Sequence, residues 1–480
     1  MRIILQASGV LPEEAHHFLR KADSTYLLVG SDLTKEGSKI KHYIQETASR
    51  DITIVPIVLT NEAVTSLPNV EIDGHIQLPP TQPSLVLFTS GTTGLPKGVV
   101  LPRRRWYVNG KSESDSFTLS YRPPHWIGGA RTLIWPVLTG GRIYILENRA
   151  SPEVFWNCIR EAKITNFAVT TTTLRELKDH FEQTIGLLSP AERNEYTAGL
   201  KSLRSFTCSG AVIAPSIRLF WHALCTDLYI QNWYASTEAG GAITGTFRES
   251  QLPHSIGWAL PGVIVKLSDG DHGEVLVKSS LMLTHYLDDE VATKTAIDEE
   301  GFYRTGDLAH RVGDEYIFDG RASTDYILYY GYRVSILELE NSLLDLPYIS
   351  EAYVLGVPDH ETKELVGALV RIRRQAISST TEAENNEQVI TLAKIRADLV
   401  LNVATHKLPA VLRILQDGED VPRTVSDKAI KKGLLQQYFG ISANLPVDHV
   451  VPGVEKLGGD PAQVATGLRP WDWCGLQRAS

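Results

Sequence analysis

The stretch LVLFTSGTTGLPKGVV, from Leu85 to Val100, holds the residues with the clearest chemical potential. After its apolar start come small and hydroxyl residues, namely Thr89, Ser90, Gly91, Thr92, Thr93 and Gly94. Such residues expose several backbone N–H groups and hydroxyls toward one point with little bulk, which suits a phosphate chain. The same composition is common in plain flexible turns, so composition alone leaves both interpretations open.

Lys97 supplies a cation beside this loop, but the segment does not follow the P-loop pattern GxxxxGK[ST]. The lysine comes after Pro96 and before Gly98, where a P-loop has a hydroxyl residue that binds magnesium. Pro96 also lacks an N–H donor and disfavours helical geometry at the preceding residue. We therefore predict that Lys97 does not begin a phosphate-cradling helix.

The bulk composition indicates a multidomain globular protein. The chain has 480 residues, 43% hydrophobic and 21% charged, which is too long for one ordinary core. A net charge of −9 disfavours a large nucleic-acid surface, and no apolar run is long enough to span a bilayer. The start, MRIILQASGV, lacks a secretory signal. Four widely spaced cysteines without a CxxC pair favour a reducing, cytoplasmic location over a zinc site.

Short apolar runs alternate with helical patterns through the first half of the chain. A helix is expected over PEEAHHFLRKA from Pro12, strands over 25–30 and 51–59, and a helix between those strands. This alternation predicts layered α/β subdomains with a largely parallel sheet. After about Pro253 the sequence GVIVKLSDGDHGEVLVKSS predicts a β-hairpin instead.

A smaller α+β region is expected from Ala322. It contains the strand-like YILYYG, the helix-like SILELENSLLDL and the strands EAYVLGV and ELVGALVRI. We therefore predict an α/β fold with a large N-terminal domain (1–320), which also has a hairpin-rich β subdomain, and a small mobile C-terminal domain (321–440). The Pro- and Gly-rich residues 441–480 are expected to form a poorly ordered tail.

The full string TSGTTGLPKGV resembles the phosphate loop of the adenylate-forming superfamily, which includes acyl-CoA synthetases, luciferases and peptide-synthetase adenylation domains. The resemblance implies that the loop wraps the β- and γ-phosphates of ATP and that Lys97 neutralises their charge. Similarly, NWYASTEAGG resembles the family segment N-x-Y-G-x-T-E, with Ala235 in place of Gly. It implies that Asn232 and Tyr234 lie at the adenine, Thr237 at the phosphates and Glu238 at Mg²⁺.

Three further segments match the family in the expected order. RSFTCSGAVI resembles the small-residue segment of the adenine and acyl pockets, which assigns Ser209, Gly210 and Ala211 there. YRTGDLAHR resembles the family's x-R-T-G-D, so Asp307 is expected to accept hydrogen bonds from the ribose hydroxyls. DGRASTDYILYYGYRV resembles the inter-domain segment, which implies Arg321 near the ribose and a hinge about Ser323.

The segment VPRTVSDKAIKK resembles the C-terminal lysine motif and places Lys428 in the catalytic position. Asp427 stands where the family has Gly, and its charge can pair with the lysine. The family mechanism implied here forms an acyl-adenylate from a carboxylic acid and ATP and then transfers the acyl group to a thiol. Rotation of the small domain would present Gly331, Tyr332 and Arg333 to the channel for that thiol.

The acid and the acceptor are less specified. His125 and Trp126 lie where relatives gate the substrate, although a purely structural role is equally consistent with the sequence. The hinge region resembles malonyl-CoA synthetases, which suggests Arg204 and Thr171 as contacts for a distal carboxylate. The expected acceptor is free CoA, with a separate carrier protein as an alternative.

A degraded, non-catalytic nucleotide-binding relative is the competing hypothesis. The family's N-terminal stretch is expected to be missing before Pro12, the segment from Lys97 to His125 is short, and Asp427 departs from the motif. ATP–pyrophosphate exchange separates the two hypotheses, because a protein that only binds ATP shows no exchange.

Overall fold

The computed structural model divides the chain into two compact units. Unit 1 comprises Met1–Thr305 and Arg311–Ile317, and unit 2 comprises Gly306–His310 and Phe318–Ser480. Only the backbone is described for Leu328, Tyr332, Arg333 and Lys363. The described residues are 10–57, 75, 78–89, 96–107, 113–146, 150–161, 164–225, 228–246, 252, 254–321, 326–329, 332–359, 363–373, 390–400, 402–403, 407–423, 429, 431, 433–441 and 452–457. Within these ranges, none of the helices has the length and apolar content needed to cross a bilayer.

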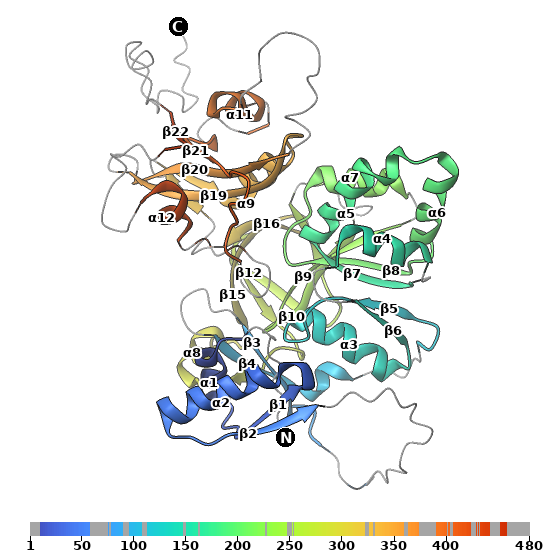
Figure 1. Ribbon diagram of the computed structural model, residues 1–480, viewed down its shortest axis with the longest axis vertical. Helices are drawn as coiled ribbons and strands as arrows, with labels where there is room; N and C mark the ends of the chain where they lie inside the picture. Colours follow the sequence, from blue (N-terminus) through green and yellow to red (C-terminus); the bar gives the residue numbers. More distant parts are fainter. Residues whose placement is uncertain are drawn as a thin grey trace. The chain divides into compact units, whose positions relative to one another are not determined.

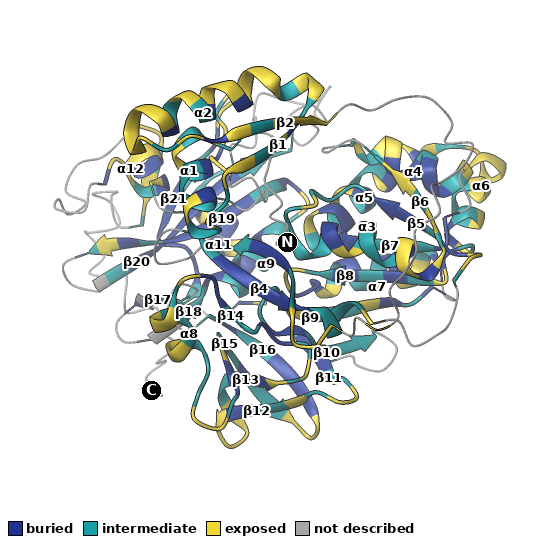
Figure 2. Cartoon of the chain, turned by 90° about the horizontal axis from the view of Figure 1, so that it is seen from below, coloured by how far each residue is buried: buried dark blue, intermediate teal, exposed yellow. Residues whose placement is uncertain are grey.

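The first part of unit 1 forms as the sequence predicts. Its elements are α1 (Pro12–Lys21), β1 (Tyr26–Gly30), η1 (Ser31–Leu33), α2 (Thr34–Ala48) and β2 (Thr53–Ile57). Proline at the first position and acidic residues in the first turn favour α1, as do basic residues in its last turn. The parallel pair β1 and β2 and the two helices bury Ala15, Leu19, Ile40, Ile44 and Ile52, whereas the outer face of α2 is exposed (Figure 2).

A parallel sheet forms the central part of unit 1. Its strands are β5 (Phe117–Ser120), β6 (Arg142–Ile145), β7 (Asn166–Thr170), β8 (Ser205–Ser209) and β9 (Ile230–Ser236), in the order β9-β8-β7-β5-β6. The helices are α3 (Ile127–Thr139), α4 (Pro152–Glu161), α5 (Thr171–Gln183), η3 (Ile185–Leu187), α6 (Pro190–Leu200) and α7 (Pro215–Leu224). In Figure 1, α4–α7 lie above β7 and β8 and α3 lies below β5 and β6. Both faces of the sheet are therefore covered.

The two edges of this sheet are used below as landmarks. The carboxyl edge contains the last residues of the parallel strands, Ser120, Thr170, Ser209 and Ser236. The amino edge contains their first residues, Phe117, Asn166, Ser205 and Ile230. Asn166 pairs with Ser205 and Thr170 pairs with Ser209, so β7 and β8 run in step from one edge to the other. In sheets of this type ligands bind at the carboxyl edge.

Antiparallel strands continue the same sheet beyond β9. They are β10 (Gly240–Thr246), β11 (Ser255–Ala259), β12 (Ile264–Asp269), β13 (His272–Lys278), β15 (Tyr303–Val312) and β16 (Glu315–Arg321), giving an eleven-stranded order β12-β13-β15-β16-β11-β10-β9-β8-β7-β5-β6. The hairpin expected after Pro253 is confirmed, since β12 and β13 pair antiparallel from Ile264 opposite Lys278. β15 and β16 contribute residues to both units.

A separate three-stranded sheet contains the strands on either side of the sequence Thr89 to Gly94, which we call the glycine-threonine loop. Its order is β14-β4-β3, with β3 (Pro83–Thr89), β4 (Lys97–Pro102) and β14 (His285–Tyr286). The turn η2 (Arg103–Trp106) follows β4, and α8 (Glu290–Ala296) follows β14. Lys97 is the first residue of a strand, which confirms that it does not begin a helix.

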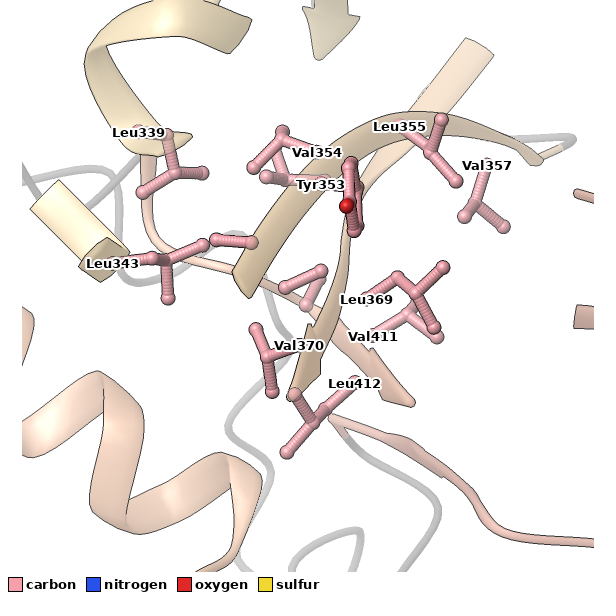
Figure 3. Close-up of a cluster of buried hydrophobic side chains, with 14 of the residues drawn as sticks. Leu339, Leu343, Tyr353, Val354, Leu355, Val357, Leu369, Val370, Val411 and Leu412 are labelled. Atoms are coloured by element: carbon pink, nitrogen blue, oxygen red, sulfur yellow. The ribbon is translucent and has the colours of Figure 1, made fainter. Parts of the chain in front are cut away.

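Unit 2 contains a mixed sheet covered by short helices. Its elements are β17 (Tyr326–Tyr329), β18 (Tyr332–Ser335), α9 (Ile336–Leu344), β19 (Ile349–Asp359), β20 (Lys363–Ile372), α11 (Leu392–Leu399), β21 (Val411–Ile414), α12 (Leu434–Phe439) and β22 (Val454–Lys456). Side chains from α9, β19, β20 and β21 meet in one apolar core (Figure 3), in which Leu343, Val354 and Leu369 are fully buried. This confirms the α+β character expected after Ala322.

One expectation for the C-terminal tail is wrong. Residues 454–456 form β22, which pairs antiparallel with β21 from Arg413 opposite Val454. Ladder hydrogen bonds to β21 hold this segment in the sheet of unit 2, despite the glycine and proline content of the surrounding sequence. The rest of residues 442–480 lies outside the described residues, apart from those that flank β22.

Candidate active site

The sheet β14-β4-β3 brings Lys97 close to a tyrosine from far along the chain. Thr89 ends β3 and Lys97 begins β4, and the two residues pair across the ladder. Tyr286 of β14 pairs with Val99 of β4, so its ring lies near the start of β4. The Lys97 ammonium lies 5.3 Å from the centre of this ring. Ser90, Gly91, Thr92, Thr93 and Gly94 lie outside the described residues, between these two strand ends.

Tyr286 links this sheet to Glu238. Its hydroxyl donates a hydrogen bond to Oε1 of Glu238 at 3.3 Å, and the phenol of Tyr303 lies nearby. Burial, followed by the nearby negative charge of Glu238, raises the pKa values of both phenols well above their usual range. Both hydroxyls are therefore protonated at neutral pH, and Tyr286 acts as a donor that orients the Glu238 carboxylate.

Glu238 lies in the turn between β9 and β10, and the half-buried Arg105 holds that turn. Nη1 of Arg105 donates to the Thr237 carbonyl at 2.7 Å and Nη2 to the Ser236 carbonyl at 3.4 Å. The backbone N–H of Leu283 donates to the Glu238 carbonyl at 2.7 Å. Gly240 closes the turn with a φ of +82°, a conformation that favours glycine.

The Arg105 guanidinium also contributes positive charge next to this turn. Burial and the charge of Arg131 lower the pKa of Arg105 to about 10, and the carboxylate of Glu238 opposes that shift. Arg105 therefore stays charged at neutral pH. It fixes the backbone of Thr237 and Glu238 while leaving the carboxylate of Glu238 oriented by Tyr286.

These residues fit a magnesium ion held largely by phosphate oxygens. Mg²⁺ usually takes one or two carboxylates and completes its shell with waters and substrate phosphates. Glu238 supplies one hard carboxylate beside Lys97 and the strand ends that flank the glycine-threonine loop. Across the described part of the chain, no group of three or more His, Cys, Asp or Glu side chains is placed to hold a metal ion by itself.

The carboxyl edge gathers the small residues expected at the nucleotide. Ser209 ends β8, and Gly210 and Ala211 follow it with exposed backbone; Gly210 has a φ of +104° and open space where a Cβ would lie. Asn232 and Tyr234 are two positions apart on β9 and therefore project from the same face. Tyr234 lies close enough to Tyr303 to influence its ionisation.

The residues expected to gate the substrate lie at the same edge. His125 and Trp126 follow β5, and their rings meet edge to face with centroids 5.9 Å apart. Burial lowers the pKa of His125, so the imidazole is neutral at neutral pH, and its Nε2 is buried without a hydrogen-bond partner within the described residues. Thr171 begins α5 directly after Thr170, whose side chain caps that helix.

The prediction that Arg204 and Thr171 contact the same distal carboxylate is wrong. Arg204 precedes β8 at the amino edge, whereas Thr171 follows β7 at the carboxyl edge, and a five-residue strand spans about 16 Å. The Arg204 side chain is 60% exposed and bonds to Asp115 at 2.5 Å. It cannot share a small substrate with Thr171.

The expected ribose contacts lie together in unit 2. Nε of Arg321 donates to Oδ1 of Asp307 at 2.7 Å, and the Asp307 side chain is 11% exposed. A charge-assisted bond of this kind fixes the carboxylate as an acceptor. Arg423 and Ala429 form an isolated bridge, but Asp427 and Lys428 lie outside the described residues, as do Ser323 and Gly331. Tyr332 and Arg333 belong to β18, and only their backbone is described.

The comparisons with known proteins agree with this arrangement. The AMP-binding enzyme family matches residues 7–287, and the AMP-binding enzyme C-terminal domain matches residues 338–428. The chain belongs to the AMP-binding enzymes. The acyl-CoA ligase oryP of Aspergillus oryzae is 32% identical over 460 residues, which cover 94% of this chain and 81% of oryP. The resemblance stated from the motifs is thereby confirmed.

More distant relatives of this AMP-binding enzyme have the same fold. The mitochondrial malonate–CoA ligase ACSF3 of Mus musculus is 27% identical over 393 residues, covering 74% of this chain and 64% of ACSF3. ATP-bound MatB from Rhodopseudomonas palustris superposes with a TM-score of 0.68 at 19% identity, covering 90% of this chain and 83% of MatB. MenE from Bacillus subtilis with an acyl-adenylate gives 0.69 at 21%, covering 90% and 82%. The predicted α/β fold class is confirmed.

Sequence reasoning missed several residues of the site. Arg105 and Tyr286 hold Glu238 and its turn from positions that no motif connects to them. Arg122, two residues after β5, was also missed, although a cation directly after a strand end and before two prolines is a visible signal.

Proposed function

We propose that this AMP-binding enzyme is an ATP-dependent acid–thiol ligase that converts a carboxylic acid into its CoA thioester through an acyl-adenylate. The observation that carries the proposal is the chain of contacts from Lys97 to Tyr286 and from Tyr286 to Glu238, which links a cation at the start of β4 to an oriented carboxylate. The acyl-CoA and malonate–CoA ligases among the relatives support CoA as the acceptor.

In the first half-reaction, an oxygen of the substrate carboxylate attacks the α-phosphorus of ATP. A P–O bond forms, the bond to pyrophosphate breaks, and an acyl-adenylate remains. Glu238 would hold Mg²⁺ together with phosphate oxygens, and the ion would supply positive charge that offsets the charge of the phosphoryl groups. Lys97 and the loop residues from Thr89 to Gly94 bind the β- and γ-phosphates. Lys428 stabilises the charge that develops at the α-phosphoryl oxygens.

The remaining contacts position the nucleotide. Tyr234 supplies an aromatic face for the adenine, with Asn232 and the Ser209–Ala211 segment beside it. Asp307, fixed by Arg321, accepts hydrogen bonds from the ribose hydroxyls. These groups lower the barrier by orientation, since the α-phosphorus must meet the carboxylate in line.

In the second half-reaction, the CoA thiolate attacks the acyl carbon. A C–S bond forms, the C–O bond to AMP breaks, and AMP leaves as the other product. Residues 321–440 act as a mobile domain that turns about Ser323, withdraws Lys428 and presents Gly331, Tyr332 and Arg333 to the thiol. Buried free thiols at Cys158, Cys208 and Cys225 support a reducing, cytoplasmic location.

Lys428→Ala tests whether Lys428 acts in the first half-reaction and not in the second. We expect ATP–pyrophosphate exchange to fall on the order of 10²-fold, because a charge that stabilises the adenylation transition state is lost. Thioester formation from supplied acyl-adenylate and CoA should survive. Lys294→Ala, at a side chain that is 81% exposed, is the matched control.

Three results would count against the proposal. Equal loss of both half-reactions in Lys428→Ala contradicts the domain rotation. ATP binding without exchange for any acid indicates a non-catalytic relative. Exchange followed by transfer to a purified carrier protein, but not to CoA, replaces CoA as the acceptor.

A further inference from the structure

Arg122 is placed at the carboxyl edge of the parallel sheet, two residues after β5 ends. Its Nη1 lies 3.5 Å from Oγ of Ser209, the last residue of β8. Its guanidinium carbon lies 5.9 Å from the centre of the Tyr121 ring. The guanidinium therefore reaches from one parallel strand to another at the edge where the expected nucleotide and acyl contacts lie.

One side of this guanidinium is buried without a partner. Nε and Nη2 of Arg122 are shielded from solvent, and neither has a hydrogen-bond acceptor among the residues that the structure describes. Nη1 uses its one contact on Ser209. Nε–H and Nη2–H point in parallel from the same side of the planar group, and this fork matches the two oxygens of a carboxylate.

Buried N–H donors without an acceptor lower the stability of the folded protein. A buried donor without an acceptor costs about 1–3 kcal/mol, and more when the group is charged. Two other arginines near the sheet avoid this cost. Arg105 donates to two backbone carbonyls, and Arg204 bonds to the carboxylate of Asp115. No acidic side chain forms an ion pair with Arg122 within the described ranges.

The neighbouring residues leave room for the guanidinium and add a second polar group without a partner. A Cβ on Gly128 would lie 2.6 Å from Nη1 of Arg122, so glycine permits the observed position. Three residues after Arg122, Nε2 of His125 is also buried without a hydrogen-bond partner in the described chain. Two such groups in one loop, beside Trp126 and Ser209, indicate a polar site whose ligand is a separate molecule.

We propose that Arg122 binds a second carboxylate of the acid substrate, distinct from the one that is adenylated, and that the enzyme thereby selects di- or tricarboxylic acids. This inference rests on the proposed ligase function. It replaces Arg204, which lies at the opposite edge, as the cation for that second carboxylate. A bidentate pair at a buried site discriminates strongly against an acid that lacks the group, because the guanidinium is then left unpaired.

The first test needs no variant. Pyrophosphate release is measured with dicarboxylic acids from malonic to sebacic acid, with citric acid, and with the monomethyl ester of each diacid. We expect kcat/KM for the best diacid to exceed that for its monomethyl ester on the order of 10²-fold, because the ester removes only the second charge. An ester or a simple monocarboxylic acid that reacts as well as the diacid overturns the proposal and leaves the ligase function intact.

The second test uses Arg122→Leu, Arg122→Lys and the control Arg204→Leu. Arg122→Leu should reduce kcat/KM for the diacid on the order of 10²-fold while changing that for the monomethyl ester little. Arg122→Lys should lose about 10-fold, since it keeps the charge but not the fork. Arg204→Leu should leave the ratio of kcat/KM for the diacid to kcat/KM for the ester unchanged.

The outcomes separate the possible failures. Equal losses for diacid and ester in Arg122→Leu overturn the proposal, because they show that Arg122 serves the nucleotide or the reacting carboxylate. If Arg122→Leu does not fold, Arg122→Lys takes its place. The ratio of kcat/KM for the diacid to kcat/KM for the ester in that variant then shows whether Arg122 binds the second carboxylate. Absence of pyrophosphate release with every acid tested overturns the ligase function itself, and the inference about Arg122 with it.

Discussion

The two edges of the parallel sheet in unit 1 differ in the partners of their polar and charged side chains. At the amino edge, Arg204 is 60% exposed and pairs with Asp115, which is 68% exposed. At the carboxyl edge, Arg122 and His125 bury polar atoms that have no partner within the described residues. An exposed ion pair contributes little to stability, whereas buried unpaired groups lower it. The guanidinium and imidazole nitrogens that are buried without a partner thus lie where chemistry is proposed, and an exposed ion pair lies at the opposite edge.

The same contrast applies to carboxylates. Glu238 at the carboxyl edge receives a hydrogen bond from a buried phenol and lies in a turn fixed by Arg105. Asp115 near the amino edge is open to water and already paired with an exposed arginine. A carboxylate that is oriented but not neutralised by a bound cation is suited to hold a metal ion, whereas one already paired is not.

Glu238→Gln should produce the largest effect. Gln keeps the size and one acceptor oxygen but loses the negative charge that we assign to Mg²⁺. We expect ATP–pyrophosphate exchange to fall on the order of 10²-fold or more at about 1 mM Mg²⁺, as when a preorganised electrostatic contact is removed. Glu290→Gln, at a side chain that is 90% exposed on α8, is the control. Unchanged exchange in Glu238→Gln would remove the carboxylate from the proposed site.

Tyr286→Phe should have an intermediate effect. The change deletes the hydroxyl that orients Glu238 while keeping the ring beside Lys97. We expect the Mg²⁺ concentration for half-maximal exchange to rise about 10-fold, with a smaller change at saturating Mg²⁺, as for other residues that orient a metal ligand. Because the pKa of Tyr286 is raised by burial, its hydroxyl stays protonated and the effect should not depend on pH between about 6 and 9.

If saturating Mg²⁺ does not restore activity to Tyr286→Phe, then Tyr286 does not act by orienting Glu238. Tyr316→Phe provides a matched control, since its hydroxyl donates to the Val265 carbonyl at 2.9 Å, away from Glu238.

Local structure could be predicted from the sequence because its causes are local. Proline and acidic residues at the start of α1, and a Gly/Asp turn between alternating strands at β12 and β13, identified these elements directly. Pro96 correctly excluded a helix at Lys97. The motifs also identified the carboxyl-edge residues Ser209 and Glu238, because each motif spans the end of a strand.

Side-chain partners could not be predicted in the same way, because they come from distant parts of the chain. Tyr286 lies 48 residues after Glu238, and Arg105 lies 132 residues before Thr237. Arg204 was expected at the substrate because it opens the segment RSFTCSGAVI, and the motif does not show at which end of β8 each of its residues lies. Only the start of β8 at Ser205 places it at the amino edge.

Arg204→Leu should have the smallest effect, and it sharpens the comparison between the two edges. We expect kcat/KM to be unchanged for every acid, because the side chain is far from the carboxyl edge. Only stability in acid should respond. The hydrogen bond and charge of Arg204 lower the pKa of Asp115, so the pair stabilises the fold above the unfolded value of about 3.9, and that contribution is lost as the pH falls.

The wild-type protein should therefore lose slightly more stability than Arg204→Leu between about pH 6 and pH 3, as measured by urea midpoints at both values. Both side chains are largely exposed, so the difference should be small and should vanish in about 1 M NaCl. A loss of diacid activity in Arg204→Leu as large as that in Arg122→Leu would contradict the contrast between the edges, since it would place a substrate contact at a solvated ion pair.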